Sequence, residues 1–244
     1  MRAAFVLVVC GACWSSPPPA QPTAEPARLP PVPAPSIAWD DHHLVDRLLP
    51  AIATDGSLVV LGIEKPDGAR GNPNFRLEVR TRTDQMQSSL DVLTVEEVDS
   101  GAFFDDTGVL APLRDRIARA NTLLAQLHAK HRLVPLKKMT LDKADDAPMS
   151  EQTARGGNLV VAWKADHVVI TDERGDGKAV LLDRAAPTTW LAPPSRSNTH
   201  ECSNPAYLDE TWASLEHRVV VITVNYEGTD ACWEPDAQPH VLAW

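Results

Sequence analysis

The 244-residue sequence has few aromatic side chains and few cysteines, and it lacks any long run of basic residues. Phe, Trp and Tyr make up 5% of the chain, and only four cysteines are present. Acidic residues outnumber Lys and Arg by 33 to 23, which gives a formal net charge of -10. A surface of this sign repels the phosphates of nucleic acids. We therefore exclude nucleic acid as a partner, and we expect any membrane attachment to be covalent.

The sequence also lacks the short motifs that mark common catalytic, nucleotide and metal sites. No GxSxG elbow, SxxK pair, P-loop, GxGxxG or HExxH occurs. The nearest outline of a calcium loop runs from Asp172 to Asp183, but Arg174 places a cation where such a loop needs an oxygen ligand. His128 and His131 have helical spacing, yet no third zinc ligand accompanies them. We predict no catalytic residue, no metal site and no cofactor.

Residues 1–12 have the composition of a signal peptide. Arg2 supplies a positive charge, and residues 3–9 form an apolar run. A run of this length is too short to cross the roughly 30 Å of a bilayer core as a helix. We therefore predict an exported protein with a cleaved leader.

The leader ends in Gly11-Ala12-Cys13. This ending resembles the signal of bacterial lipoproteins, in which a pair of small residues precedes the cysteine that receives the lipid. The resemblance implies a lipid attached to Cys13 and, because Trp14 rather than Asp follows, sorting to the outer membrane. Cys10 stands where the family usually has Leu, so cleavage by ordinary signal peptidase to a soluble periplasmic or secreted protein is the alternative.

Residues 13–38 are rich in proline. Nine prolines lie between Pro17 and Pro35, mixed with Ala, Ser and Gln. Such a composition buries too little apolar surface to fold, and proline holds it extended as polyproline II at about 3.1 Å per residue. We interpret this segment as a tether that holds a domain away from the membrane.

Two cysteines, Cys202 and Cys232, remain outside the leader region. An exported chain meets an oxidising compartment, so a remaining pair of cysteines is expected to form a disulfide. Closing a loop of this size would stabilise the fold by roughly 3–4 kcal/mol on the chain-entropy model. We predict a Cys202–Cys232 bond that pins two loops of the C-terminal region.

The hydrophobic pattern of residues 39–244 predicts a single globular α+β domain with mainly antiparallel strands. Apolar residues from Leu113 to Leu127 recur three and four apart, which predicts one long amphipathic helix over about 110–132. Shorter helices are expected at Asp40–Leu49 and Tyr207–Leu215. The expected strands lie at 57–63, 75–80, 91–98, 159–163, 167–171, 179–182, 218–226 and 240–244.

A short segment at residues 50–60 offers an alternative fold. It has a proline, a pair of small residues, an Asp-Gly turn and an apolar run. This order is similar to the opening of a blade in TolB-type β-propellers. The resemblance implies a β-propeller-like fold, although no second copy at the expected period is present.

Functional expectations rest on one polar loop. Several hydrogen-bonding residues of this loop are candidates for recognising a ligand. They are Asp67, Arg70, Asn72 and Asn74. We predict a non-enzymatic binding or interaction module that is anchored to the membrane by lipid, with an envelope protein or glycan as its partner. The alternative is a periplasmic hydrolase whose catalytic residues come together only in three dimensions.

Overall fold

The computed structural model describes residues 32–40, 43–64, 73–99, 104–105, 108–109, 111–142, 151–164, 166–175, 177–191, 206–226 and 238–244. Pro33–Trp244 forms one compact unit. Every strand pairing in the described residues is antiparallel, and one helix of 21 residues accompanies the strands. The prediction of mainly antiparallel β structure with one long helix is therefore confirmed.

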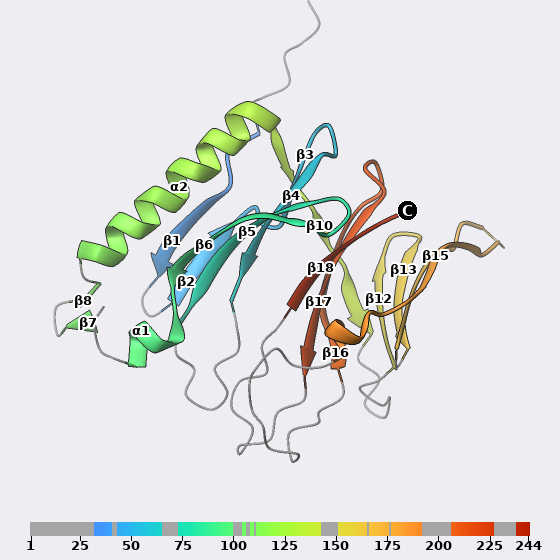
Figure 1. The fold of residues 1–244 in the computed structure, drawn as a ribbon. Helices are drawn as coiled ribbons and strands as arrows, with labels where there is room; N and C mark the ends of the chain where they lie inside the picture. Colours follow the sequence, from blue (N-terminus) through green and yellow to red (C-terminus); the bar gives the residue numbers. More distant parts are fainter. Residues whose placement is uncertain are drawn as a thin grey trace, which may run out of the picture. The chain divides into compact units, whose positions relative to one another are not determined.

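Three larger sheets account for most of the strands (Figure 1). The first sheet has the order β6 (Met86–Leu93), β5 (Phe75–Thr81), β4 (Leu58–Ile63), β3 (Ala51–Ala53) and β9 (Leu133–Pro135). The second has the order β10 (Lys137–Lys138), β16 (Ala206–Ser214), β17 (Val219–Tyr226) and β18 (Gln238–Ala243). The third has the order β11 (Thr140–Asp142), β12 (Glu151–Gly156), β13 (Leu159–Lys164), β14 (His167–Asp172) and β15 (Ala179–Ala185).

Smaller elements complete the described structure. Two hairpins are formed by β1 (Ser36–Asp40) with β2 (His43–Arg47) and by β7 (Phe104–Asp105) with β8 (Gly108–Val109). The helical elements are α1 (Val95–Asp99), α2 (Ala111–His131) and a 3-10 turn at Thr188–Trp190.

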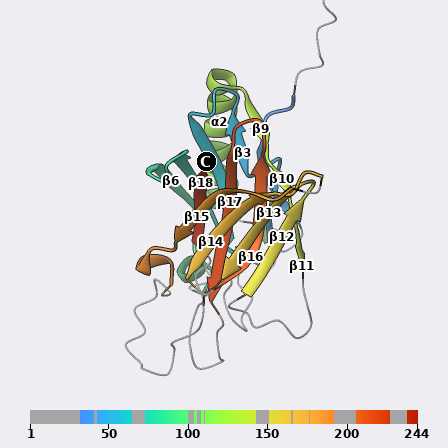
Figure 2. The same cartoon turned by 90° about the vertical axis from the view of Figure 1, so that its right-hand side faces the viewer.

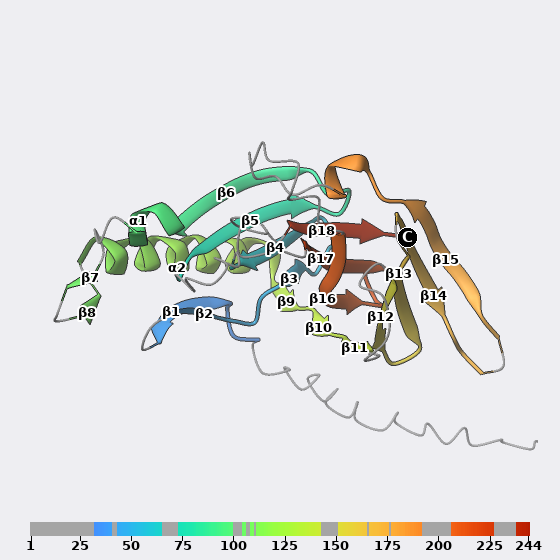
Figure 3. The same cartoon turned by 90° about the horizontal axis from the view of Figure 1, so that it is seen from below.

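The sheets form layers with a hydrophobic core between each neighbouring pair (Figure 3). The core between α2, the β1–β2 hairpin and the first sheet includes Ile37, Leu77, Leu113 and Leu124. The core between the first and second sheets includes Ile52, Leu61, Leu136 and Val221. The core between the second and third sheets includes Trp163, Ile170, Leu208 and Ile222. The first and second sheets are thus covered on both faces.

Strand β17 shows how an uninterrupted apolar run serves two cores at once. Successive side chains of a strand point to opposite faces. Val219 and Val221 accordingly pack toward the first sheet, whereas Val220 and Ile222 pack toward the third. A strand buried on both faces needs apolar residues at every position, which is why residues 218–226 read as the most apolar stretch of the chain.

A single extended segment, residues 133–142, adds an edge strand to each of the three sheets in turn (Figure 2). Its strands β9, β10 and β11 have only three, two and three residues. Leu136 lies between β9 and β10 and is buried in the core of the first two sheets, while Met139 lies between β10 and β11 and is buried in the next core. The segment thereby joins the layers along one side.

The long helix α2 confirms the apolar seam expected from the sequence. Leu113, Ala120 and Leu124 are fully buried, and Ile117 and Leu127 pack partly buried against the same core. The side chain of Asn121 holds the first strand to this helix. Its Oδ1 accepts the backbone N–H of Ile37 at 2.8 Å, and its Nδ2 donates to the Ile37 carbonyl at 2.9 Å.

The helix expected at Asp40–Leu49 is wrong, because this region contains the last residue of β1 and the whole of β2. Residues 36–38, which we assigned to the end of the tether, form the first part of β1, and Ile37 is only 3% exposed. The apolar residues that imitate a helix are Leu44 and Val45 in β2 and Leu48 and Leu49 just after it. Their helical spacing is a coincidence. Leu48 has a φ of 67°, which no right-handed helix accommodates.

The helix expected at Tyr207–Leu215 is also wrong, because β16 occupies this segment. A β-bulge between Leu208 and Glu210 inserts one extra residue into the strand. Leu208 and Ala213 consequently face the same core although they are an odd number of residues apart. The bulge breaks the two-residue alternation of a strand, and the broken pattern imitates the spacing of a helix.

Charged side chains also connect the first and second sheets. Asp84, in the β5–β6 turn, accepts hydrogen bonds from Arg80 Nη1 at 2.8 Å, from His240 Nδ1 at 3.0 Å and from the backbone N–H of Val241 at 2.8 Å. Arg80 also pairs with Glu78 at 2.7 Å. These side chains are at most 17% exposed, so the network is largely shielded from water.

Candidate functional site

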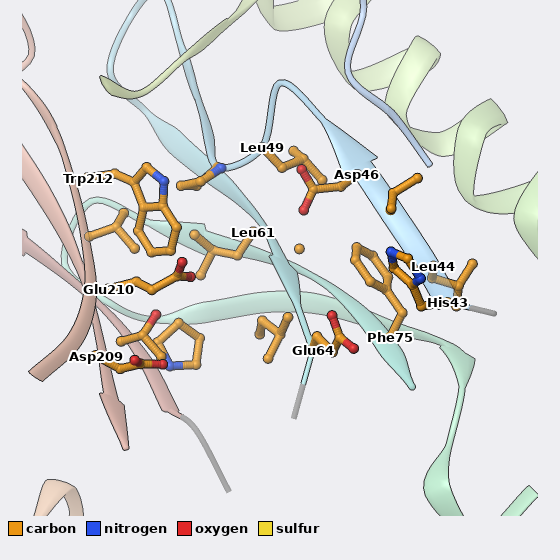
Figure 4. Close-up of a pocket in the computed structure, with 17 residues that line it drawn as sticks. His43, Leu44, Asp46, Leu49, Leu61, Glu64, Phe75, Asp209, Glu210 and Trp212 are labelled. Carbon is orange, nitrogen blue, oxygen red and sulfur yellow. The ribbon is translucent and has the colours of Figure 1, made fainter. Parts of the chain in front are cut away.

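An acidic pocket of about 390 Å³ opens between β2, β4 and β5 on one side and β16–β17 on the other. Its carboxylates come from three strands or strand ends and are those of Asp46, Glu64, Asp209 and Glu210. Apolar side chains that include Leu61, Phe75, Trp212 and Val221 form the rest of its wall. Figure 4 shows the side chains of Asp46, Glu64 and Glu210 together with those of Leu61, Phe75 and Trp212. Among the described residues that line the pocket, His43 is the only basic one.

The bulge in β16 explains why two neighbouring acids line one pocket. In a regular strand, Asp209 and Glu210 would point to opposite faces of the sheet. The register of β16 with β17 shifts at this point, so that Leu208 lies opposite Val224 and Glu210 lies opposite Thr223. Bulges are a common means of re-aiming side chains beside functional sites, and here both acids contribute to the pocket.

A glycine allows Asp46 to lie over β4. A methyl group at Gly62 would stand 2.8 Å from Asp46 Oδ2 and 2.7 Å from Phe75 Cζ. Both distances are shorter than a van der Waals contact, so any side chain at this position would displace these two groups. Gly62 therefore fixes the close approach of the Asp46 carboxylate and the Phe75 ring to the strand.

Burial gives Asp46 the most perturbed pKa in the pocket. Loss of solvent raises the pKa of Asp46, a backbone hydrogen bond from Leu49 opposes this, and the negative charges of Glu210 and Glu64 raise it further, to about 6. Burial likewise raises the pKa of Glu64, with His43 lowering it and Glu210 raising it. The raised values mean that the pocket holds its negative charges at a cost in free energy that a bound cation would relieve.

Two residues of the pocket wall, Glu210 and Trp212, already contact an ammonium group, that of Lys138 on the neighbouring strand β10. Lys138 Nζ forms a salt bridge with Glu210 Oε1. The same Nζ lies 5.6 Å from the centre of the Trp212 ring, which is a cation–π distance. Glu210 and Trp212 both line the acidic pocket. A carboxylate and an aromatic face thus already bind one alkylammonium group together.

Most residues singled out from the sequence lie outside the described residues. These are the lipid-attachment residue Cys13, the disulfide pair Cys202 and Cys232, and the loop residues Asp67, Arg70 and Asn72. Of the recognition loop only Asn74 is described, and it is 5% exposed. Its side chain is therefore covered by the fold rather than presented at the surface. The lipid site, the disulfide and the loop stay predictions.

The sequence reasoning missed all four pocket acids, because they lie up to 164 positions apart and match no motif. One signal was nevertheless present. Glu64 and Phe75 flank the polar loop that we singled out, and both line the pocket. The interrupted alternation around Asp209 was a second signal, since a bulge produces such a pattern.

The segment with the outline of a calcium loop is a hairpin turn between β14 and β15, as its glycines indicated. Arg174 Nε lies 2.9 Å from Asp172 Oδ2, so the first carboxylate of the outline is paired with a cation. No group of three or more His, Cys, Asp or Glu side chains in the described part of the chain is arranged to hold a metal ion.

Comparison with known proteins identifies no relative of this chain. No family model matches it, and neither a curated protein nor a solved structure matches it. None of the helices in the described residues combines the length and the apolar character needed to cross a membrane.

Proposed function

We propose that this chain is a lipid-anchored envelope protein whose folded domain binds a partner through a positively charged group in the acidic pocket. The observation that carries the binding site is that four acidic residues line one pocket beside apolar side chains, with the pKa of Asp46 raised to about 6. A pocket of this size is within the range that accommodates small ligands or a side chain of a larger one. A cation entering it would relieve the repulsion among the acids.

The proposed partner is an envelope protein or a glycan. An envelope protein would present the positive group as a lysine side chain, and a glycan would present it as an amino sugar. Both groups have an ammonium on a partly apolar body, which matches carboxylates set among Leu61, Phe75 and Trp212. The anchor at Cys13 and the tether over residues 13–35 would hold the domain off the outer membrane. We further assign the domain to the α+β class, since α2 supplies one wall of a core.

Binding is tested by titrating the full chain with n-butylammonium and glucosamine, using isothermal titration calorimetry at low salt. Uncharged analogues, n-butanol and N-acetylglucosamine, control for apolar contact. We expect saturable binding of the cations that Asp46→Asn and Glu210→Gln each weaken at least tenfold. The control Glu96→Gln, which neutralises an exposed acid on α1, should leave the affinity unchanged. Equal binding of charged and uncharged probes would contradict the proposal.

The membrane anchor is tested separately by intact-mass analysis of the protein purified from native membranes. We expect a diacyl or triacyl adduct that is lost in Cys13→Ser. A soluble form with an unmodified N-terminus that is unaffected by this substitution would show instead that ordinary signal peptidase releases the protein.

The raised pKa of Asp46 favours one second candidate, a periplasmic hydrolase. A carboxyl that keeps its proton near pH 6 beside an ionised carboxylate is the arrangement used for general acid catalysis of glycoside hydrolysis. In this case chromogenic amino-sugar glycosides should be cleaved, and Asp46→Asn should abolish cleavage while substrate still binds. Binding without turnover favours the interaction module.

A further inference from the structure

A second cavity, of about 510 Å³, shares no lining residue with the acidic pocket. It is bounded by β9–β10, the turn after β12 and the turn between β16 and β17. Its polar lining includes Ser214, His217, Lys137, Lys138 and Glu216, and its apolar lining includes Val134, Met139 and Leu215. The cavity therefore brings a hydroxyl, an imidazole and charged residues of both signs beside an apolar surface.

Ser214 and His217 are hydrogen-bonded to each other. Ser214 Oγ lies 2.8 Å from His217 Nδ1, and His217 Nε2 lies 3.1 Å from the carbonyl oxygen of Thr54. A carbonyl can only accept a hydrogen bond, so Nε2 carries the ring proton of the neutral imidazole. Nδ1 is then unprotonated, and the hydroxyl of Ser214 donates to it.

We propose that Ser214 is a nucleophile activated by His217, in an acyl-transfer site that cleaves carboxylic esters. A nucleophile within hydrogen-bonding reach of a base, with the base oriented by a third group, is the arrangement common to serine hydrolases of unrelated folds. Here the third group is the Thr54 carbonyl, from the β3–β4 turn of the first sheet, which orients the ring and fixes its tautomer. This site does not depend on the acidic pocket.

The reaction proceeds in two balanced steps. Ser214 Oγ attacks the ester carbonyl carbon while its proton moves to His217 Nδ1, and that proton then passes to the departing alcohol as the C–O bond breaks. Water next attacks the acyl-serine, giving its proton to Nδ1, and the acid leaves as Oγ regains a proton. Lys137 lines the same cavity, so its positive charge favours the oxyanion formed in each step.

The cavity indicates the kind of ester. Val134, Met139 and Leu215 supply an apolar surface for the acyl group. Ser214 ends strand β16, His217 lies in the tight turn that follows, and both are partly buried, which suits a small acyl group better than a long chain. A short-chain acyl ester, such as an acetyl group on a sugar or an alcohol, is the substrate class that fits.

The competing explanation is that the Ser–His contact only stabilises the β16–β17 turn. Ser214 Oγ also accepts the backbone N–H of His217 at 3.3 Å, as turn-stabilising serines do. A purely structural contact would leave the hydroxyl as unreactive as any other serine. The two explanations therefore differ in the chemical reactivity of position 214 and not only in stability.

The first experiment treats the full chain with a fluorophosphonate probe and maps the adduct by peptide mass spectrometry. We expect labelling at Ser214, no labelling at the exposed Ser88 of β6, and hydrolysis of p-nitrophenyl acetate that is lost in Ser214→Ala. His217→Gln should lower the labelling rate at least tenfold, since a positioned general base contributes typically about 10²-fold or more. Labelling at Ser214 that His217→Gln leaves unchanged would overturn the role of the base.

The second experiment keeps the proposal testable if Ser214→Ala destabilises the turn. In Ser214→Cys, the imidazole should promote ionisation of the introduced thiol, so its alkylation by iodoacetamide at pH 7 should be at least tenfold faster than that of the thiol in Ser88→Cys. Adding His217→Gln should remove the difference. Absence of fluorophosphonate labelling in the native chain, together with equal alkylation rates at positions 214 and 88, would show that the contact only locks the turn.

Discussion

The network around Asp84 should contribute much of the stability that holds the first and second sheets together. Asp84→Asn is the suitable perturbation, because Asp84 has a φ of 65° and Asn tolerates this conformation better than Ala does. The amide keeps the size of the carboxylate but removes its charge, and its NH2 group must replace an oxygen that accepts one or more of three hydrogen bonds. The donors of these bonds are Arg80, His240 and the backbone of Val241. The substitution therefore leaves a buried cation without its full partner.

We expect Asp84→Asn to lower the free energy of unfolding by about 2–4 kcal/mol, since loss of a hydrogen-bonded partner from a buried ion pair costs in this range. The matched control is Asp91→Asn in β6. Asp91 pairs with Arg76 at 2.6 Å, but both side chains are more than a third exposed, at 48% and 35%. Exposed pairs contribute at most about 1 kcal/mol. Urea unfolding followed by tryptophan fluorescence measures both variants.

The pH dependence provides a second check on the same network. Burial raises the pKa of Asp84, but hydrogen bonds from His240, Val241 and Arg80 outweigh it and hold this pKa below its ordinary value. The stability that Asp84 contributes is therefore present above pH 4 and is lost as the pH falls further. The difference in the free energy of unfolding between the native protein and Asp84→Asn should therefore become smaller below pH 4. A destabilisation no larger than that of Asp91→Asn at pH 7 would refute the reasoning.

Three further predictions concern other parts of the fold. The pKa of Asp46 is raised to about 6, so its protonated form favours folding below about pH 4 and this contribution is lost as the pH rises through 6. The free energy of unfolding of Asp46→Asn should therefore rise by about 2 kcal/mol relative to that of the native protein between pH 4 and pH 7 in urea unfolding. Leu124→Ala, in the fully buried seam of α2, should cost about 2–5 kcal/mol in the same assay, against less than about 1 kcal/mol for the exposed Leu215→Ala. Non-reducing peptide mapping of the exported protein should recover one linked pair, Cys202 with Cys232, whereas free thiols at both positions would show that no disulfide forms.

The parts of the fold that the sequence predicted are those in which each element obeys one period. The seam of α2 repeats every three to four residues along 21 residues, and β17 is apolar at nearly every position because both of its faces are buried. The elements that the sequence did not predict depend on tertiary structure. The bulge in β16 and the apolar spacing from Leu44 onward both imitate the pattern of a helix. Strands of two or three residues, such as β9 and β10, are too short to show a period at all.

The acidic pocket could not be predicted for a related reason. Its carboxylates come from β2, from the end of β4 and from the bulge in β16, and only the packing of the second sheet against the first brings them together. Single acids at such positions look like ordinary surface residues in the sequence. Gly62 is the exception, since an isolated glycine inside an apolar strand indicates a close approach of another group.

The most direct test of the central claim is whether a cation displaces the proton of Asp46 when it binds. Calorimetric titrations of n-butylammonium at pH 6, in two buffers with different ionisation enthalpies, report the number of protons released. Because the pKa of Asp46 is raised to about 6, about half of this carboxyl is protonated there, and a bound cation lowers its pKa; we predict release of roughly half a proton per cation bound. Asp46→Asn should abolish the release. Binding with the same heat in both buffers, or no binding at all, would contradict the assignment of this pocket as the cation site.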